Sequence, residues 1–186
     1  MSRIKIIDQS QATGSLREIY DELIKSRGQL AGIHQIQSLR PESIRAHMAL
    51  YMEIMFSRSD LSRAERELIG TVVSVANGCK YCTSHHAEAL NHYWKDKDKI
   101  EGLINGNYKE ILSSREQLLI GFSKHLTMHP AEHEDNDFVE ELKEFGLSDA
   151  AILDVVLVTA YFNFVNRIVL SLGVTLEPDR GTGYKY

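Results

Sequence analysis

Residues 67 to 86 read Glu67-Leu-Ile-Gly-Thr-Val-Val-Ser-Val-Ala-Asn77-Gly78-Cys79-Lys-Tyr-Cys82-Thr-Ser-His85-His86. The apolar run before Asn77 and the helix formers after Cys79 predict two helices, and an Asn-Gly pair is typical of the sharp turn that would join them. A helical hairpin with a Cys-x-x-Cys motif at the start of its second arm is therefore expected. Helix formers also fill most of the remaining chain, and no alternating strand pattern stands out, so the predicted fold class is all-α.

The hairpin would bring three reactive side chains together. Each helical residue rises by about 1.5 Å, which places Glu67 roughly 15 Å before the turn and His86 roughly 13 Å after it. The Glu67 carboxylate is then expected to hold the His86 imidazole, which shares a helix face with Cys82, four residues earlier. This pattern predicts a proton relay from Glu67 through His86 to Cys82.

Other interpretations of the cysteine pair stay open. Buried cysteines often behave as small hydrophobic residues without reactivity. Zinc is a second possibility, with Cys79, Cys82 and His86 as ligands and His85 or a distant histidine as the fourth. Covalent haem attachment is excluded by Thr83, because that motif needs a histidine directly after the second cysteine. Which cysteine ionises first is also open, since the helix end favours Cys79 and the pairing with His86 favours Cys82.

Composition and charge narrow the class of protein. The chain has 186 residues, 43% of them hydrophobic, and a net charge of -5 without a dense basic cluster, so nucleic acid is not an expected partner. Residues 1–14 lack a signal-peptide core, which predicts a cytoplasmic protein. The apolar stretch 150–172 carries Asp154 and Arg167, and the segment between them is too short to span a membrane, so a buried core helix covered on most sides is expected.

Helix boundaries follow from capping residues and breakers. Three Ser-x-x-Glu capping boxes predict helix starts, at Ser15 with Glu18, at Ser62 with Glu65 and at Ser113 with Glu116. The first of these helices would run to Gly28 and the third to Met128. Shorter helices are expected over 33–39 and 136–145, a longer one from Pro41, and the last from Ser148 to Gly173.

The sequence predicts no function for two polar clusters. The charged run 95–99 is predicted to be a solvated helix end. His125, His129 and His133 recur at intervals of four, but Pro130 breaks the helical register, so they are interpreted as scattered surface histidines.

At the hairpin residues the sequence resembles the carboxymuconolactone decarboxylase and AhpD-like superfamily, in particular its peroxidase-related, alkylhydroperoxidase branch. The resemblance covers about 41–173 and includes Cys79-Lys-Tyr-Cys82, His86, Glu67 and the segment Tyr161-Phe-Asn-Phe-Val-Asn-Arg167. It implies an AhpD-like helical bundle in a single domain over 1–186, with an N-terminal extension (1–40), a core (41–173) and an irregular tail (174–186).

The resemblance also implies an activity and roles for the site residues. Cys82 is similar to the peroxidatic cysteine of an antioxidant thiol peroxidase, Cys79 to its more exposed partner, and Glu67 with His86 to the proton relay. Tyr81 departs from AhpD itself, where histidine is common. The implied partners are a hydroperoxide and a dithiol or lipoyl-type reductant, with no bound cofactor or metal.

Alternatives to the peroxidase remain. A redox-sensing or disulfide-reductase module and a zinc-stapled helical scaffold are both compatible with the motif, whereas the decarboxylase branch lacks the cysteine pair. The apolar last helix and the tail tyrosines Tyr184 and Tyr186 predict a homo-oligomer, either a dimer, a trimer or a hexamer.

Overall fold

The computed structural model describes residues 2–177, and this part of the chain contains helices and no strands. The predicted all-α class is therefore confirmed. A short 3-10 helix at Gln9–Gln11 precedes ten α-helices. These are α1 (Gly14–Arg27), α2 (Gly32–Gln35), α3 (Pro41–Phe56), α4 (Arg63–Ala76), α5 (Lys80–Trp94), α6 (Lys97–Ile104), α7 (Ser114–Met128), α8 (Glu132–Asp135), α9 (Val139–Glu144) and α10 (Asp149–Leu172).

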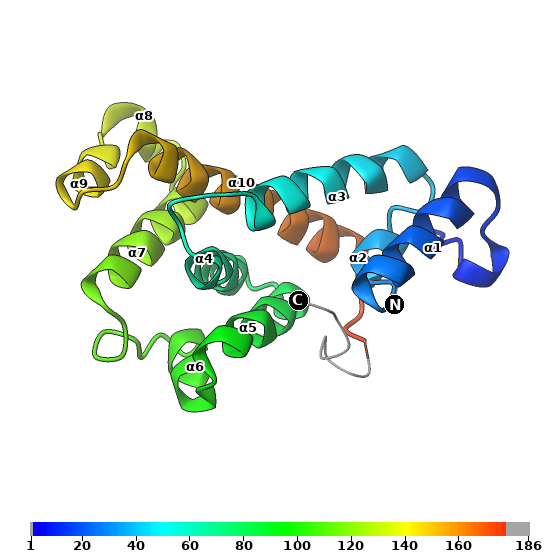
Figure 1. Ribbon diagram of the computed structural model, residues 1–186, viewed down its shortest axis with the longest axis horizontal. Helices are drawn as coiled ribbons and strands as arrows, with labels where there is room; N and C mark the ends of the chain where they lie inside the picture. The colour runs from blue at the N-terminus through cyan, green and yellow to red at the C-terminus, as the bar shows by residue number, and fades with distance from the viewer. Residues whose placement is uncertain (1, 178–186) are drawn as a thin grey trace.

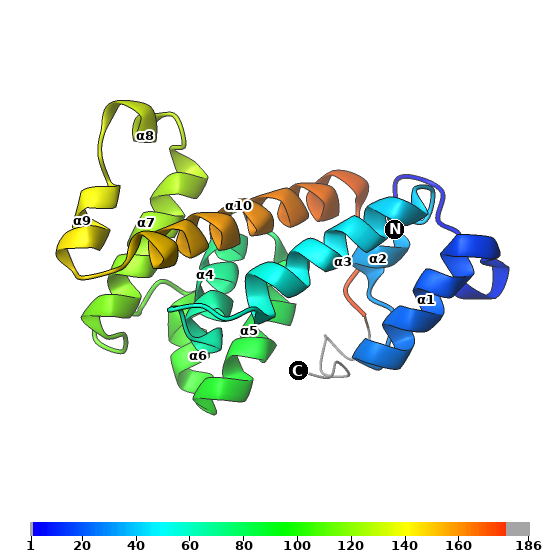
Figure 2. The same cartoon turned by 45° about the horizontal axis from the view of Figure 1, so that its top comes forward.

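Helix α4 lies at the centre of the bundle, with α5, α7 and α10 packed against it (Figure 1). The long helix α10 runs beside α3 along the longest axis of the molecule (Figures 1 and 2). Helices α1 and α2 lie at one end of that axis, and α7, α8 and α9 lie at the other. The predicted turn is present: Asn77 ends α4, Gly78 has a φ of 67°, and Cys79 is the N-cap of α5.

Two of the three capping boxes are confirmed and one prediction is wrong. The side chains of Ser62 and Ser113 each accept a bond from the amide of the glutamate three residues later, and that glutamate bonds back to the serine amide. Helix α1 instead begins at Gly14 with Thr13 as its N-cap and no side-chain cap. Ser15 is already inside the first turn, so its hydroxyl cannot serve the cap position.

The charged run 95–99 is not the solvated end of a single helix. Lys95 has a φ of 53° and ends α5, and the side chain of Asp96 then accepts a bond from the amide of Lys99 and caps the new helix α6. A residue in the left-handed region stops a helix, while a following aspartate starts one, and the two events together allow the chain to reverse. The predicted helices at 33–39 and 136–145 are also shorter than expected, as α2 and α9.

Helix α10 packs closely on the hairpin through Gly70. A methyl group placed on Gly70 would lie 2.6 Å from the Phe162 ring, so the two helices approach each other at a contact that only glycine allows. Helix α10 is also the one described helix long and apolar enough to cross a membrane by length and composition, a test that core helices pass as well.

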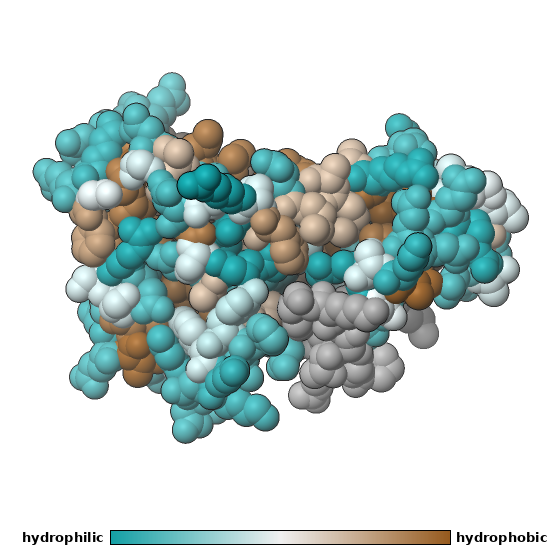
Figure 3. Space-filling model, viewed as in Figure 1, coloured by the Kyte–Doolittle hydropathy of each residue, from teal (hydrophilic) through white to brown (hydrophobic). Residues whose placement is uncertain are grey.

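The expectation that α10 is covered on most sides is not met within one chain. Its inward face joins the main core, but Leu153, Leu157 and Phe164 are exposed by 57%, 39% and 47%. Figure 3 shows hydrophobic surface along the upper edge of the molecule, where α10 lies in Figure 1. One chain supplies neighbours for only one side of this helix.

Candidate active site

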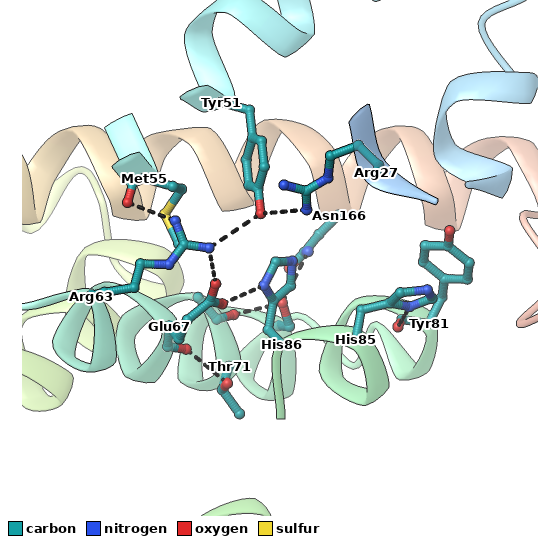
Figure 4. A network of polar contacts seen from close by, with 12 residues as sticks. Arg27, Tyr51, Met55, Arg63, Glu67, Thr71, Tyr81, His85, His86 and Asn166 are labelled. Carbon is teal, nitrogen blue, oxygen red and sulfur yellow. Dashed lines mark hydrogen bonds and ion pairs between the residues drawn. The ribbon is translucent and has the colours of Figure 1, made fainter. Parts of the chain in front are cut away.

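Glu67 and His86 meet across the α4–α5 hairpin. Glu67 is fully buried, and its Oε2 lies 2.8 Å from His86 Nδ1 (Figure 4). The contact expected from the rise of the two helices is therefore present. The His86 ring also packs edge-on against Phe162, with ring centroids 4.3 Å apart, which fixes its orientation.

Arg63 completes the environment of the carboxylate, and the sequence interpretation missed it. It stands one helical turn before Glu67, and its Nη2 lies 2.5 Å from Glu67 Oε1, while its Nη1 donates to the Met55 carbonyl at 2.6 Å. Burial acts to raise the pKa of Glu67, but His86 and Arg63 outweigh it and hold this pKa below its ordinary value. The four-residue spacing was the signal that could have identified Arg63.

An ionised Glu67 determines which nitrogen of the His86 ring carries the hydrogen. A carboxylate can only accept, so His86 Nδ1 must donate, and its Nε2 is left available as the basic nitrogen. His86 also lines the cavity that opens beside Cys82. The pair therefore presents an oriented imidazole, which is the arrangement that a general base needs.

The two cysteine sulfurs lie 2.7 Å apart as free thiols. The resemblance implied that Cys79 is the more exposed of the two, whereas in the structure both are buried, with exposed fractions of 0% for Cys79 and 2% for Cys82. Cys79 occupies the turn between the helices, where its amide donates to the Ser74 carbonyl and its side chain belongs to the main core. Only Cys82 lines the cavity.

The contact between the two sulfurs favours ionisation of Cys79 and opposes ionisation of Cys82. The pKa of Cys79 lies below its ordinary value, chiefly because the Cys82 thiol hydrogen-bonds to it. The same contact, together with burial, raises the pKa of Cys82. The second thiolate of the pair would be a buried like charge beside the first, so one negative charge is shared over the motif. Electrostatics thus favour Cys79 as the first thiolate, whereas the cavity is open to Cys82.

A cavity of about 90 Å³ opens beside the motif. Residues from five regions of the chain form its walls: Arg27 at the end of α1, a segment around α2, one face of α3, the start of α5, and the middle of α10 with Tyr161 and Phe162. Burial lowers the pKa of His34 to about 3 and that of His47 to about 4, so both rings are neutral near pH 7. The cavity is therefore mainly apolar, with one guanidinium from Arg27 on its wall.

A second glutamate and histidine pair lies at the start of α5. The chain after α10 folds back so that Glu177 Oε2 lies 3.1 Å from His85 Nε2, and its Oε1 accepts from the Tyr81 hydroxyl at 2.9 Å and from the Gly32 amide at 2.8 Å. These bonds outweigh burial and lower the pKa of Glu177 to about 2. Tyr184 and Tyr186, on which the predicted homo-oligomer partly rests, lie outside the described residues.

The structure brings His125, His129 and His133 close to one another. His125 Nδ1 lies 3.1 Å from His133 Nε2, and Glu132 contacts both His125 and His129, at 3.1 and 3.4 Å. These histidines lie at the surface as predicted, but they are not scattered, because the chain turns at α8 after Pro130 and brings them together. Within residues 2–177 no group of three or more His, Cys, Asp or Glu side chains is arranged to hold a metal ion.

The fold and the residues on the hairpin define an AhpD-like helical bundle. The sequence profile of the Carboxymuconolactone decarboxylase family matches residues 41–108, which contain Glu67, both cysteines and His86. Two crystal structures match almost the whole chain at about a quarter sequence identity. The chain belongs to the AhpD-like and carboxymuconolactone decarboxylase superfamily.

The similar proteins come from several bacteria. The AhpD-core, peroxidase-related protein of Ralstonia eutropha JMP134 is 25% identical over 97% of this chain and 94% of its own, with a TM-score of 0.85. The peroxidase-related protein of Silicibacter sp. TM1040 is 26% identical over 98% of both chains, with a TM-score of 0.83. The uncharacterized protein YdfG of Bacillus subtilis is 27% identical over 135 residues, 73% of this chain and 90% of its own.

Proposed function

We propose that this protein is a thiol-dependent peroxidase of the alkyl hydroperoxide reductase type. The observation that supports it most is the shared cavity, where Cys82 and the His86 ring line one space, while Cys79 lies 2.7 Å from Cys82 and Glu67 lies 2.8 Å from His86. Cys82, His86 and Cys79 have the chemistry of a nucleophile, a base and a resolving thiol. The peroxidase-related names of two similar proteins agree with this function.

The reaction has two steps on this chain. The Cys82 sulfur attacks the outer oxygen of a hydroperoxide; the S–O bond forms, the O–O bond breaks, and an alcohol or water leaves. His86, held by Glu67, takes up the thiol proton and returns it to the leaving oxygen. Cys79 then attacks the sulfenic acid of Cys82 and expels water, which forms the disulfide and prevents further oxidation. An external dithiol, of the lipoyl type or another, reopens the disulfide by exchange.

Cys82 is assigned the attack on peroxide because Cys79 does not reach the cavity, although electrostatics favour Cys79 as the first thiolate. A proton shared between the two sulfurs allows the negative charge to be on either cysteine. When Cys82 gives its proton to His86, the Cys79 thiol can in turn donate to the Cys82 thiolate across the same 2.7 Å contact.

Trapping of sulfenic acid tests this assignment. The Cys79→Ser variant should accumulate sulfenic acid with one equivalent of cumene hydroperoxide, and the Cys82→Ser variant should not. Lys80→Ala, an exposed change between the cysteines, is the matched control and should cycle like the parent. Sulfenic acid formed only in Cys82→Ser would overturn the assignment.

Turnover separates the peroxidase from the other candidates. Repeated consumption of hydroperoxide with dihydrolipoamide as reductant is expected. Oxidation that stops after one equivalent would favour a redox sensor. Near-stoichiometric zinc in protein purified without chelator, released by thiol oxidation, would favour the zinc-stapled scaffold. Both results would contradict the peroxidase.

A further inference from the structure

Tyr161 also lines the cavity beside Cys82 and His86, and neither step of the proposed reaction uses it. Tyr161 comes from the middle of α10 and is 5% exposed, and its hydroxyl oxygen lies 2.6 Å from Nε2 of the His47 ring on α3. A contact of this length is a hydrogen bond, but its direction depends on which ring nitrogen of His47 carries hydrogen.

Gln37 determines which ring nitrogen of His47 carries the hydrogen. Its Nε2 donates to the Ile33 carbonyl at 2.8 Å and lies 2.9 Å from His47 Nδ1. The amide cannot be turned over, because its oxygen would then face the Ile33 carbonyl oxygen. Both hydrogens of the amide are thus used, and Nδ1 of His47 must accept one of them.

His47 therefore donates to Tyr161. Burial lowers the pKa of His47 to about 4, so at neutral pH the ring holds a single hydrogen. With Nδ1 accepting from Gln37, that hydrogen is on Nε2 and is donated to the Tyr161 oxygen.

The hydrogen of the Tyr161 hydroxyl is consequently available to the cavity. It cannot return to His47, and in the described part of the chain, residues 2–177, no other acceptor for it is found. Burial raises the pKa of Tyr161 well above its ordinary value, so the hydroxyl keeps its hydrogen near neutral pH. The cavity measures only about 90 Å³, so a peroxide group held against Cys82 also lies close to the wall that Tyr161 forms.

We propose that Tyr161 is a further catalytic residue, whose O–H donates a hydrogen bond to the oxygen that leaves when Cys82 attacks a hydroperoxide. This inference rests on the proposed peroxidase function. As the S–O bond forms and the O–O bond breaks, negative charge grows on the departing oxygen, and a donor already aimed at that position stabilises it. The proton that completes the alcohol still comes from Cys82 by way of His86, so Tyr161 ends each turnover unchanged.

The dependence on leaving group tests the role. Single-turnover oxidation of the reduced protein is compared for tert-butyl hydroperoxide, which releases a basic alkoxide, and peracetic acid, which releases a weakly basic carboxylate. Loss of one such donor typically costs about 100-fold or more in rate, and Tyr161→Phe should lose on this order with tert-butyl hydroperoxide and clearly less with peracetic acid. An equal loss with both peroxides, or no loss, would overturn the inference.

Two further variants separate chemistry from packing. Tyr20→Phe removes another buried tyrosine hydroxyl, which donates to the Ile7 carbonyl at 3.0 Å outside the cavity, and should leave both rates unchanged. Gln37→Leu does not change the cavity wall but frees the His47 ring to accept from Tyr161. It should show a smaller loss with the same dependence on leaving group, and an equal loss with both peroxides would count against the inference.

Nitrogen NMR of the His47 ring tests the geometry without any activity. The parent protein at neutral pH should show a protonated Nε2 and an unprotonated, hydrogen-bonded Nδ1. The reverse tautomer would overturn the inference even if Tyr161→Phe fails to fold. A parent protein that oxidises with neither peroxide would instead contradict the proposed function itself, while normal parent rates with an unchanged Tyr161→Phe contradict only the role of Tyr161.

Discussion

Neutral histidines in the cavity wall are a consequence of where the chain places them. Isolated in the sequence, His34 and His47 carry no recognisable signal, yet α2 and α3 bury both rings side by side, with centroids 5.6 Å apart. Desolvation first, and then the neighbouring His47 and Arg27, lower the pKa of His34 to about 3. Nδ1 of His34 has no hydrogen-bond partner in the described residues. Such rings resist protonation in the folded protein, whereas they take up a proton readily in the unfolded chain.

This difference predicts acid sensitivity. The unfolded His34 ring takes up a proton below about pH 6.5, whereas the folded ring stays neutral down to about 3, so the free energy of unfolding falls as the pH is lowered through that window. His34→Gln should reduce the loss between pH 7 and pH 4 by up to about 3 kcal/mol. Urea unfolding at both pH values measures it. Parallel pH dependence in parent and variant would contradict the low pKa.

At the scale of single helices, the boundary of α4 positions the site. The capping box at Ser62 fixes the first turn, which contains Arg63, and Glu67 follows one turn later on the same face of the helix. A frayed start of α4 would loosen the ion pair that orients the His86 ring.

Removing the cap should therefore have a measurable cost. Ser62→Ala is expected to lower the free energy of unfolding by about 1 kcal/mol, because the amide of Glu65 loses the hydroxyl that accepts its hydrogen bond. Ser15→Ala is the matched control, since Ser15 is exposed within α1 and caps nothing. It should change the free energy of unfolding by less than about 0.5 kcal/mol. Denaturant titration decides; equal effects of the two changes would refute the assigned cap.

The contact between α4 and α10 gives a second prediction at this scale. Gly70→Ala puts a methyl group 2.6 Å from Phe162, the ring that packs on His86, and should cost about 1–3 kcal/mol of stability. Gly121→Ala in α7 meets nothing within 4 Å and should stabilise by about 0.5–1 kcal/mol. Thermal unfolding of both variants measures the pair. A stabilised Gly70→Ala would show that the helices are farther apart.

For the whole molecule, the exposed side of α10 is the feature that one chain leaves incomplete. Leu153, Leu157 and Phe164 are four and seven residues apart and so share one face of the helix. Exposed apolar side chains grouped in this way are typical of association between chains.

We therefore expect a homo-oligomer that buries this face of α10. Light scattering at micromolar concentration should give a multiple of 21.1 kDa, and Leu157→Lys should lower the mass because it places a charge in the contact. A monomer mass for the parent would rule out the prediction.

Much of the fold was predictable because its signals are local. Capping at Ser62, the turn at Asn77-Gly78 and the start at Pro41 depend on a few neighbouring residues, and the structure contains all three. The false box at Ser15 and the missed start of α6 at Asp96 are errors of the same local kind, because a serine or a charge run fits several positions equally well.

The amino-acid sequence by itself determined the helical hairpin and the pairing of Glu67 with His86, because the rise of two helices about a fixed turn leaves little freedom. Only the tertiary structure decided the rest of the site. Arg63 was within local reach but carried no prediction, whereas Tyr161 on α10 meets His47 across 114 positions of the chain. The tertiary structure also decided that Cys79 is buried and that, of the two cysteines, only Cys82 faces the cavity. Exposure and long-range hydrogen bonds depend on which helices cover a residue, and no short stretch of sequence contains that information.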